Sequence, residues 1–418
     1  MGRMMKDSGI EWIGQIPQEW IVLRNKNLFQ CSKEIVGDKW SETQLLSLTT
    51  KGIKKKGFDQ IAGKVPDSFE TYQTVIPNSI VMCLFDLDCS AVFSGISPYY
   101  GMISPAYKVL TCNNNFYPNF ADYWFSYVFE GRKFKHYSKN LRYTLNYDEF
   151  AVLPAIVPPL PEQKRIADFL DLKCAEIDSV IGNTEATIEE YKKLKQSIIT
   201  EAVTKGIRGD RPMKDSGIEW IGEIPEEWDV LPHKYIMHKE KNVCEHYNGE
   251  DIISLTMSGV IVRDLEAGGK MPTTFDGYQY VEPEDLLLCL FDIDVTPRCV
   301  GLVKNAGLTS PAYSRFKVHS GFYNCYYNYL LRAIDDDKVF VHLSKNLRSS
   351  LTETDFGAIK TIVPPLSEQE EIADYLDSKC SEIDKLIESK QKIIEELQAY
   401  KKSVIYEYVT GKKEVSIC

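Results

Sequence analysis

The sequence lacks the short motifs that mark the common enzyme classes. It has no GxxxxGKT or GxxxxGKS phosphate loop, no GxGxxG after a strand-like run, no HExxH and no GxSxG. Its six histidines are scattered without the spacing of metal ligands. We therefore expect that the chain is not an enzyme and that it holds no metal and no cofactor of its own.

Cysteine pairs and long apolar runs are also missing. The 11 cysteines include no CxxC pair, and no apolar run approaches the ~20 residues that a membrane-spanning helix requires. Scattered thiols in a chain without a signal peptide are typical of a reducing compartment. We expect a soluble, cytoplasmic protein.

Acidic residues outnumber basic ones in the chain, 60 to 49, but the two are unevenly distributed. The net charge of −11 argues against a large nucleic-acid surface, because phosphate contacts need lysine and arginine. Residues 21–157 nevertheless carry 15 basic and 12 acidic residues, whereas residues 229–363 carry 14 and 18. Any DNA-binding surface must therefore be local.

What the chain does contain is an internal repeat. Residues 157–178 and 363–384 are identical at 16 of 22 positions, and residues 5–20 and 213–228 at 14 of 16. We call the second pair the lead segments. Their aromatic residues, such as Trp20, have the spacing of packing residues, and we expect them in or against a core. Each half of the chain is then a lead segment, a globular body and a helix.

A long helix is predicted after each body. Pro158, Pro159 and Pro161 suit a helix start, and Gly206 and Gly411 suit the two helix ends. Apolar residues recur every three or four positions, which is the spacing of a seam between two paired helices. The residues expected to pair the helices are Leu170, Ile177, Ile181 and Ile188 in the first and Leu376, Ile383, Ile387 and Ile394 in the second.

The bodies are predicted to mix short strands and short helices. Residues 79–88 and 285–294 are expected to form buried strands, and residues 120–129 and 326–333 to form helices. The predicted class is α+β, with two similar bodies, two long antiparallel coiled-coil helices and a pseudo-two-fold repeat. The expected division is a first body at 1–157, a first spacer helix at 158–205, a linker and second body at 206–363, a second spacer helix at 364–412 and a tail at 413–418.

The two bodies differ most in two pairs of turn-rich segments, residues 50–64 against 258–270 and residues 89–103 against 295–309. Binding residues tend to lie in such loops, where basic side chains contact phosphates and amides bond adenine. A solvated surface loop is the alternative for the lysine cluster. The candidate DNA-binding residues are Lys51, Lys54, Lys55, Lys56, Tyr99, Tyr100, Lys139, Asn140 and Arg142 in the first body and Arg263, Arg298, Lys304, Asn305, Lys345, Asn346 and Arg348 in the second.

Paired aspartates offer a competing interpretation. Asp86 and Asp88 are repeated as Asp292 and Asp294. Alternate residues of a strand point to one face, so each pair has the geometry to hold a divalent ion, as in a metal-dependent nuclease. A strand-end hydrogen-bonding role and a contact to the amino group of cytosine are the other readings of these residues.

The repeated motifs resemble one known family. The pattern PPLxEQxxIAxxLDxKxxEID at residues 158 and 364, with the doubled KDSGIEWIGxIPxEW lead segment, is similar to the specificity subunit of Type I restriction-modification systems. The resemblance covers nearly the whole chain. It implies two target recognition domains that each read one half of a split DNA site, and two helices that set the gap between the halves.

The resemblance also implies partners. They are double-stranded DNA, two methyltransferase subunits that bring S-adenosylmethionine and methylate adenine N6, and two restriction subunits that translocate DNA with ATP and Mg²⁺. The chain would supply recognition and no catalysis. A metal-dependent nuclease that uses Asp86 and Asp88, or a coiled-coil adaptor that binds only proteins, remains the alternative.

Overall fold

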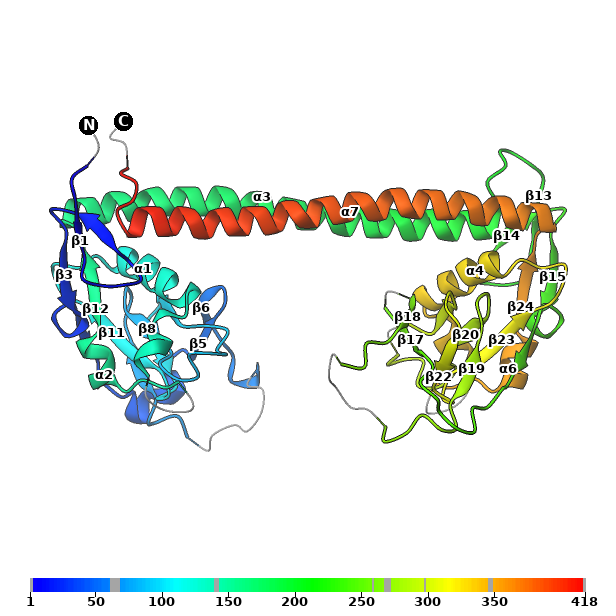
Figure 1. The fold of residues 1–418 in the computed structure, drawn as a ribbon, viewed down its shortest axis with the longest axis horizontal. Helices are drawn as coiled ribbons and strands as arrows, with labels where there is room; N and C mark the ends of the chain where they lie inside the picture. Colours follow the sequence, from blue (N-terminus) through cyan, green and yellow to red (C-terminus); the bar gives the residue numbers. More distant parts are fainter. Residues whose placement is uncertain are drawn as a thin grey trace. The chain divides into compact units, whose positions relative to one another are not determined.

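The chain folds as two compact units. The computed structural model describes residues 3–60, 68–138, 143–257, 259–266, 272–296, 298–344 and 349–415. Unit 1 comprises Met1–Glu185 with Lys392–Cys418, and unit 2 comprises Ala186–Gln391. Each unit therefore contains one globular body and part of each long helix, α3 (Leu160–Lys205) and α7 (Leu366–Val409) (Figure 1).

The body of unit 1 is built on a small antiparallel sheet. Its order is β4 (Phe29–Cys31), β11 (Lys108–Cys112), β8 (Ile80–Met82) and β9 (Ser94–Ile96). Helix α1 (Pro118–Glu130) lies between this sheet and the long helices (Figure 1). The remaining elements are the paired strands β1 (Met5–Asp7) and β2 (Gln15–Pro17), β3 (Ile21–Arg24) and β12 (Pro154–Val157), β5 (Leu46–Thr49) and β6 (Gly52–Lys55), β7 (Gln73–Val75) and β10 (Gly101–Ile103), and helix α2 (Tyr147–Val152).

The body of unit 2 repeats this plan. Its first sheet has the order β16 (Met237–Glu240), β23 (Ser314–Val318), β20 (Leu286–Leu288) and β21 (Val300–Leu302). The counterparts of β5, β6, β7 and β10 join here into one sheet, in which only β17 and β22 run parallel. That sheet has the order β18 (Gly259–Val262), β17 (Ile252–Thr256), β22 (Gly307–Thr309) and β19 (Gln279–Val281). The remaining strands of unit 2 are β13 (Met213–Asp215), β14 (Glu223–Pro225), β15 (Asp229–Pro232) and β24 (Lys360–Val363). Its short helices are α4 (Asn324–Asp336), α5 (Val339–Leu343) and α6 (Glu353–Ala358).

The strands predicted at 79–88 and 285–294 are shorter than expected. They end at Met82 and Leu288, and the chain then turns through Asp86 at φ 52° and Asp292 at φ 47°. A strand cannot continue through this left-handed backbone conformation. The two helices predicted in the bodies are present and extend a few residues beyond the predicted bounds.

The long helices run antiparallel within each unit. In unit 1, the ring of Phe169 lies 4.4 Å from that of Tyr408, and Asp178 forms a 2.7 Å ion pair with Lys401. In unit 2, the repeat-related Asp384 forms a 2.7 Å ion pair with Lys195. Residue numbers thus rise along α3 as they fall along α7, which is the antiparallel arrangement that the predicted fold class requires.

The residues expected to pair the helices are largely covered. Ile181 and Ile387, which occupy the same position in the two copies, are only partly buried. The other six are fully buried: Leu170, Ile177, Ile188, Leu376, Ile383 and Ile394. Within the part of the chain that the structure describes, no helix carries an apolar stretch long enough to cross a lipid bilayer.

Candidate nucleic-acid interface

The repeated helix-start motif joins each lead segment to its body. The indole N–H of Trp20 donates to Glu162 at 2.9 Å, and that of Trp228 donates to Glu368 at 3.0 Å. Both indoles are fully buried, which agrees with the packing role expected for them. Arg3 and Arg211 complete the two clusters by ion pairs of 2.6 Å with the same glutamates. These tryptophans are therefore not available to a partner.

The glutamine that follows each glutamate fixes the body to the helix. Gln163 accepts from the backbone N–H of Tyr117 at 2.7 Å, and Gln369 accepts from that of Tyr323 at 2.8 Å. Both tyrosines immediately precede the helices α1 and α4. The motif shared by the two copies thus builds the scaffold, and residues that distinguish the copies must lie elsewhere.

The lysine cluster of unit 1 lies on the hairpin of β5 and β6. Lys51 is in the turn, whereas Lys54 and Lys55 lie on β6, so the prediction that the whole cluster is a loop is wrong for these two residues. Leu46, Leu48 and Ile53 bury the inner side of the hairpin in a small core. Lys51, Lys54 and Lys55 are exposed, and Lys56 is partly buried. The ammonium group of Lys55 lies 4.9 Å from the ring centre of Tyr99, and Tyr100 is 59% exposed.

Unit 2 contains the same hairpin with different outward side chains. The hydroxyl of Thr49 donates to the carbonyl of Gly52 at 2.7 Å, and that of Thr256 donates to the carbonyl of Gly259 at 2.9 Å. Ile261 and Val262 stand where unit 1 has Lys54 and Lys55, and they are 44% and 40% exposed. Arg263 stands at the position of Lys56.

Arg298, another predicted DNA contact, is engaged inside unit 2. Its Nε donates to the carbonyl of Met257 in the hairpin turn at 3.0 Å. Burial and the neighbouring Arg332 lower the pKa of its guanidinium group. Arg298 therefore stabilises the hairpin turn through this hydrogen bond. Lys304 and Asn305, by contrast, are exposed between β21 and β22.

Six predicted contacts lie outside the described residues and stay predictions. They are Lys139, Asn140, Arg142, Lys345, Asn346 and Arg348.

The paired aspartates lie in turns and not on strands. The carbonyl of Asp86 accepts from the backbone N–H groups of Cys89 and Ser90, and Arg132 donates to the carbonyl of Ser90 at 2.9 Å. The alternation that would point two carboxylates to one face is therefore absent. Among the described residues, no group of three or more histidine, cysteine, aspartate or glutamate side chains has the geometry to hold a metal ion.

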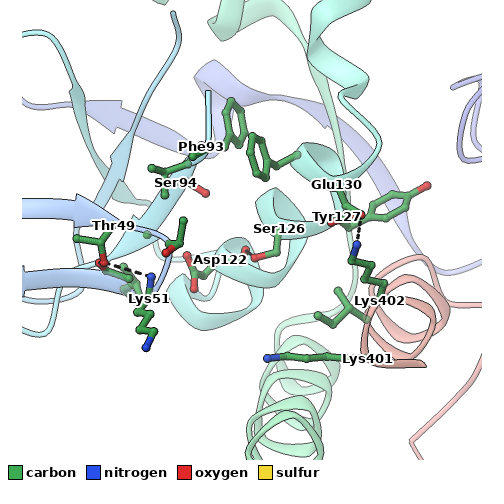
Figure 2. Close-up of a pocket in the computed structure, with 18 of the residues that line it drawn as sticks. Thr49, Lys51, Phe93, Ser94, Asp122, Ser126, Tyr127, Glu130, Lys401 and Lys402 are labelled. Atoms are coloured by element: carbon green, nitrogen blue, oxygen red, sulfur yellow. Dashed lines mark hydrogen bonds and ion pairs between the residues drawn. The ribbon is translucent and has the colours of Figure 1, made fainter. Parts of the chain in front are cut away.

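Unit 1 also contains a pocket that was not predicted from the sequence. We call it the α1 pocket; its volume is about 730 Å³, and its walls are the turn of the β5–β6 hairpin, strand β9, helix α1 and the neighbouring turns of α3 and α7. Asp122 and Ser126 of α1 face it, with Lys51 and Lys401 on other walls (Figure 2). The spacing of Asp122, Ser126 and Glu130, four residues apart on a predicted helix, was the available signal.

Comparisons with known proteins point to one family. A family model for the Type I restriction modification DNA specificity domain matches residues 312–399. A Methanocaldococcus jannaschii protein named as the specificity subunit of the type I restriction enzyme MjaX is 26% identical over 408 residues, which are 90% of this chain and 89% of that protein. A second protein of this organism, named as the type I restriction enzyme MjaVIII specificity subunit, is 37% identical over 81 residues, or 19% and 17% of the two chains.

One solved structure shares the fold along nearly the whole chain. It comes from work on complex assembly and conformational transition of the type I R-M system, and it matches with a TM-score of 0.68 and 12% identity over 95% of this chain and 99% of that one. The predicted α+β fold with two bodies and paired long helices is thereby confirmed. In its repeat, its fold and its matched sequence, the chain is similar to the specificity subunits of type I restriction-modification systems.

Proposed function

We propose that the chain recognises DNA for a type I restriction-modification complex, and that each body reads one half of a two-part, asymmetric site. The observation that carries this proposal is the comparison of the two hairpins. Lys54 and Lys55 of unit 1 favour contacts with phosphates, whereas Ile261 and Val262 of unit 2 suit apolar contacts such as the methyl group of thymine. One scaffold with two sets of outward side chains supports the reading of two different sequences.

The long helices are proposed to set the gap between the half-sites. Both α3 and α7 contribute residues to both units, so the length of these helices determines how much chain separates the bodies. We further propose that the chain recruits two methyltransferase subunits, which use S-adenosylmethionine to methylate adenine N6, and two restriction subunits, which use ATP and Mg²⁺. Its own contribution is recognition, and the absence of enzyme motifs in the sequence supports that assignment.

The hairpin comparison can be tested by converting one hairpin into the other. In the assembled complex, the double variant Lys54→Ile/Lys55→Val should flatten the plot of log affinity against log salt by about 2, because each lost phosphate contact removes a slope of roughly 0.9. Modified-base sequencing should show a change in one half of the methylated site only. Lys193→Ala/Lys385→Ala, which removes two exposed charges from the long helices, is the control.

An unchanged slope in the Lys54→Ile/Lys55→Val variant would instead favour a protein adaptor. A change in both half-sites would contradict the assignment of one body to each half.

The role of the helices can be tested by lengthening both. Seven residues inserted after Glu185 of α3 and after Gln391 of α7, the points at which the units divide, keep the apolar stripe in phase. Seven residues add about 10 Å of helix, which corresponds to about 3 base pairs at roughly 3.4 Å each. The methylated site should gain about 3 unspecified base pairs with both half-sites intact. A gap of unaltered length would remove the helices from this role.

A further inference from the structure

The α1 pocket of unit 1 has the dimensions of a ligand site. Its volume of about 730 Å³ lies within the range of roughly 300–1,000 Å³ that small-molecule sites occupy. The walls combine aromatic side chains, Phe93 and Phe129, with hydroxyl and carboxyl groups. A mixed lining of this kind can both cover a ligand and orient it.

One stripe of side chains on helix α1 faces the pocket. Asp122, Ser126 and Glu130 are four residues apart and therefore lie on one side of the helix. In unit 2, the same three positions of α4 are Asn328, Arg332 and Asp336. The middle position is thus a short hydroxyl in unit 1 and a guanidinium group in unit 2.

A second arginine distinguishes the two units at this place. Val92, in the wall of the α1 pocket, is replaced in unit 2 by Arg298, which reaches the carbonyl of Met257 in the hairpin turn. Arg332 and Asp336 are close enough to Arg298 to act on its charge. Unit 2 therefore places two of its own guanidinium groups where unit 1 has Val92 and Ser126.

The charges around the α1 pocket leave one carboxylate without a cation. Glu130 forms a 2.6 Å ion pair with Lys402, and Asp178 forms a 2.7 Å ion pair with Lys401. Among the described residues, Asp122 has no ion-pair partner, although the backbone N–H of Ile96 is close to it. Burial raises the pKa of the Asp122 carboxyl to about 6. At neutral pH the pocket therefore presents a carboxylate that a bound cation would neutralise.

We propose that the α1 pocket binds a guanidinium group, which takes the place that Arg332 and Arg298 occupy in unit 2. The group is planar and offers five N–H donors, so it can form two parallel hydrogen bonds with the carboxylate of Asp122 and one with the hydroxyl of Ser126. The source is either an arginine side chain of a partner protein or a free guanidino compound.

The full-length chain allows a direct test by methyl NMR. With isoleucine and valine methyl groups labelled, n-butylguanidinium at pH 7.5 should shift the signals of Val92, Ile96 and Ile405, which line the pocket, and leave Ile387 of unit 2 unshifted. The neutral n-butylurea has the same shape and should cause no shift. Equal shifts with both compounds, or none with either, would overturn the proposal.

Two further probes separate the possible sources. N-acetyl-argininamide, compared with N-acetyl-citrullinamide, represents an arginine within a protein. Binding of this probe at least as tight as that of n-butylguanidinium indicates a protein side chain. Binding of n-butylguanidinium alone indicates a free compound, because the peptide groups are then excluded.

Three variants test the residues involved. Asp122→Asn keeps the shape of the pocket and should lower its affinity for n-butylguanidinium at least tenfold. Ser126→Arg should abolish binding, because it supplies internally the group that Arg332 supplies in unit 2. Asn328→Asp in unit 2 is the matched control and should create no binding, since Arg332 already fills that position. Unchanged affinity in the Asp122→Asn variant would refute the proposal, whatever the other two variants do.

Discussion

The two units share the contacts that join their elements, but they differ in the polar and charged residues that they bury. The tryptophan–glutamate hydrogen bond and the helix-capping boxes of α2 and α6 occur in both. Inside the first sheet, however, unit 2 has the ion pair of Arg315 and Asp285, whereas unit 1 has Val109 and Ser79. The repeat thus preserves contacts between elements and lets the interior of each body change.

The difference shows which substitutions a duplicated scaffold tolerates. A contact such as Trp20 with Glu162 joins segments that are distant in sequence, so a change at one position leaves the other unpaired. Arg315 lies on β23 and Asp285 immediately precedes the paired strand β20, and unit 1 has the uncharged Val109 and Ser79 at both positions. Each unit therefore has its own sensitivity to mutation and to pH.

The largest effect is expected at the buried ion pair of unit 2. The Nε of Arg315 lies 2.5 Å from Asp285, and both side chains are 2% exposed. Arg315→Met leaves a buried carboxylate without its cation and should destabilise unit 2 by about 3–5 kcal/mol. Hydrogen exchange of peptides from β20 and β23, read by mass spectrometry, measures this change separately from unit 1.

A matched double variant sharpens the comparison. Arg315→Val/Asp285→Ser copies the residues of unit 1 and removes both charges, so most of the lost stability should return. If the double variant were as unstable as Arg315→Met, the cost would come from lost packing and not from the unpaired charge.

The second-largest effect is a pH dependence of the stability of unit 2, at a position where the two units carry different polar residues. His233 of unit 2 is fully buried and contacts the carbonyl of Phe356, where Asn25 of unit 1 donates to the carbonyl of Phe150. Burial lowers the pKa of His233 from 6.5 to about 4. Below pH 6.5 the unfolded chain binds a proton that folded unit 2 cannot, so stability falls as the pH drops from 6.5 to about 4.

The expected loss is about 3 kcal/mol, since one pKa unit corresponds to about 1.4 kcal/mol. His233→Asn copies unit 1 and should remove this pH dependence from unit 2. Hydrogen exchange at a series of pH values, corrected for the intrinsic exchange rate, provides the measurement. The hypothesis fails if the slope persists in the variant.

Much of this architecture could be predicted from the sequence, because the repeat is explicit. The helix bounds followed from Pro158 and Gly206, and the packing of Trp20 followed from its residue type. The partner of Trp20 could not be predicted, since Glu162 is 142 residues away and only the fold brings the two together.

The site was harder to predict than the fold. Lys54 and Lys55 lie on a strand, although their basic, glycine-flanked sequence is typical of a loop, because the buried residues around Ile53 form the hairpin. Arg298 was expected on the surface, but its role depends on a neighbour, Met257, that sequence spacing does not reveal. The α1 pocket depends on the short side chains of Val92 and Ser126, and sequence alone does not show that these two residues line one cavity.

A smaller effect is expected at Asp122. Burial raises the pKa of its carboxyl from 3.8 to about 6, so the folded state holds the proton more tightly than the unfolded chain. The stability of unit 1 should therefore decline as the pH rises from about 4 to about 6. Because the carboxyl is only partly enclosed, we expect Asp122→Asn to stabilise unit 1 by about 1–2 kcal/mol at pH 7 and by nothing below pH 4. The thermal midpoint of both proteins at pH 4 and pH 7 tests this difference.

The smallest effects are expected where the two units are alike, at the ion pairs between the long helices. Lys401 with Asp178 and Lys195 with Asp384 have the same length of 2.7 Å, and both aspartates are more than half exposed. Lys401→Ala and Lys195→Ala should each cost less than about 1 kcal/mol, and high salt should reduce both losses. Exchange of α7 peptides from residues 392–409 and of α3 peptides from residues 186–205 measures the two effects side by side. Equal losses of stability would mean that the two ion pairs contribute alike, although the bodies differ. A loss above about 2 kcal/mol in only one unit would show that the helices differ as well.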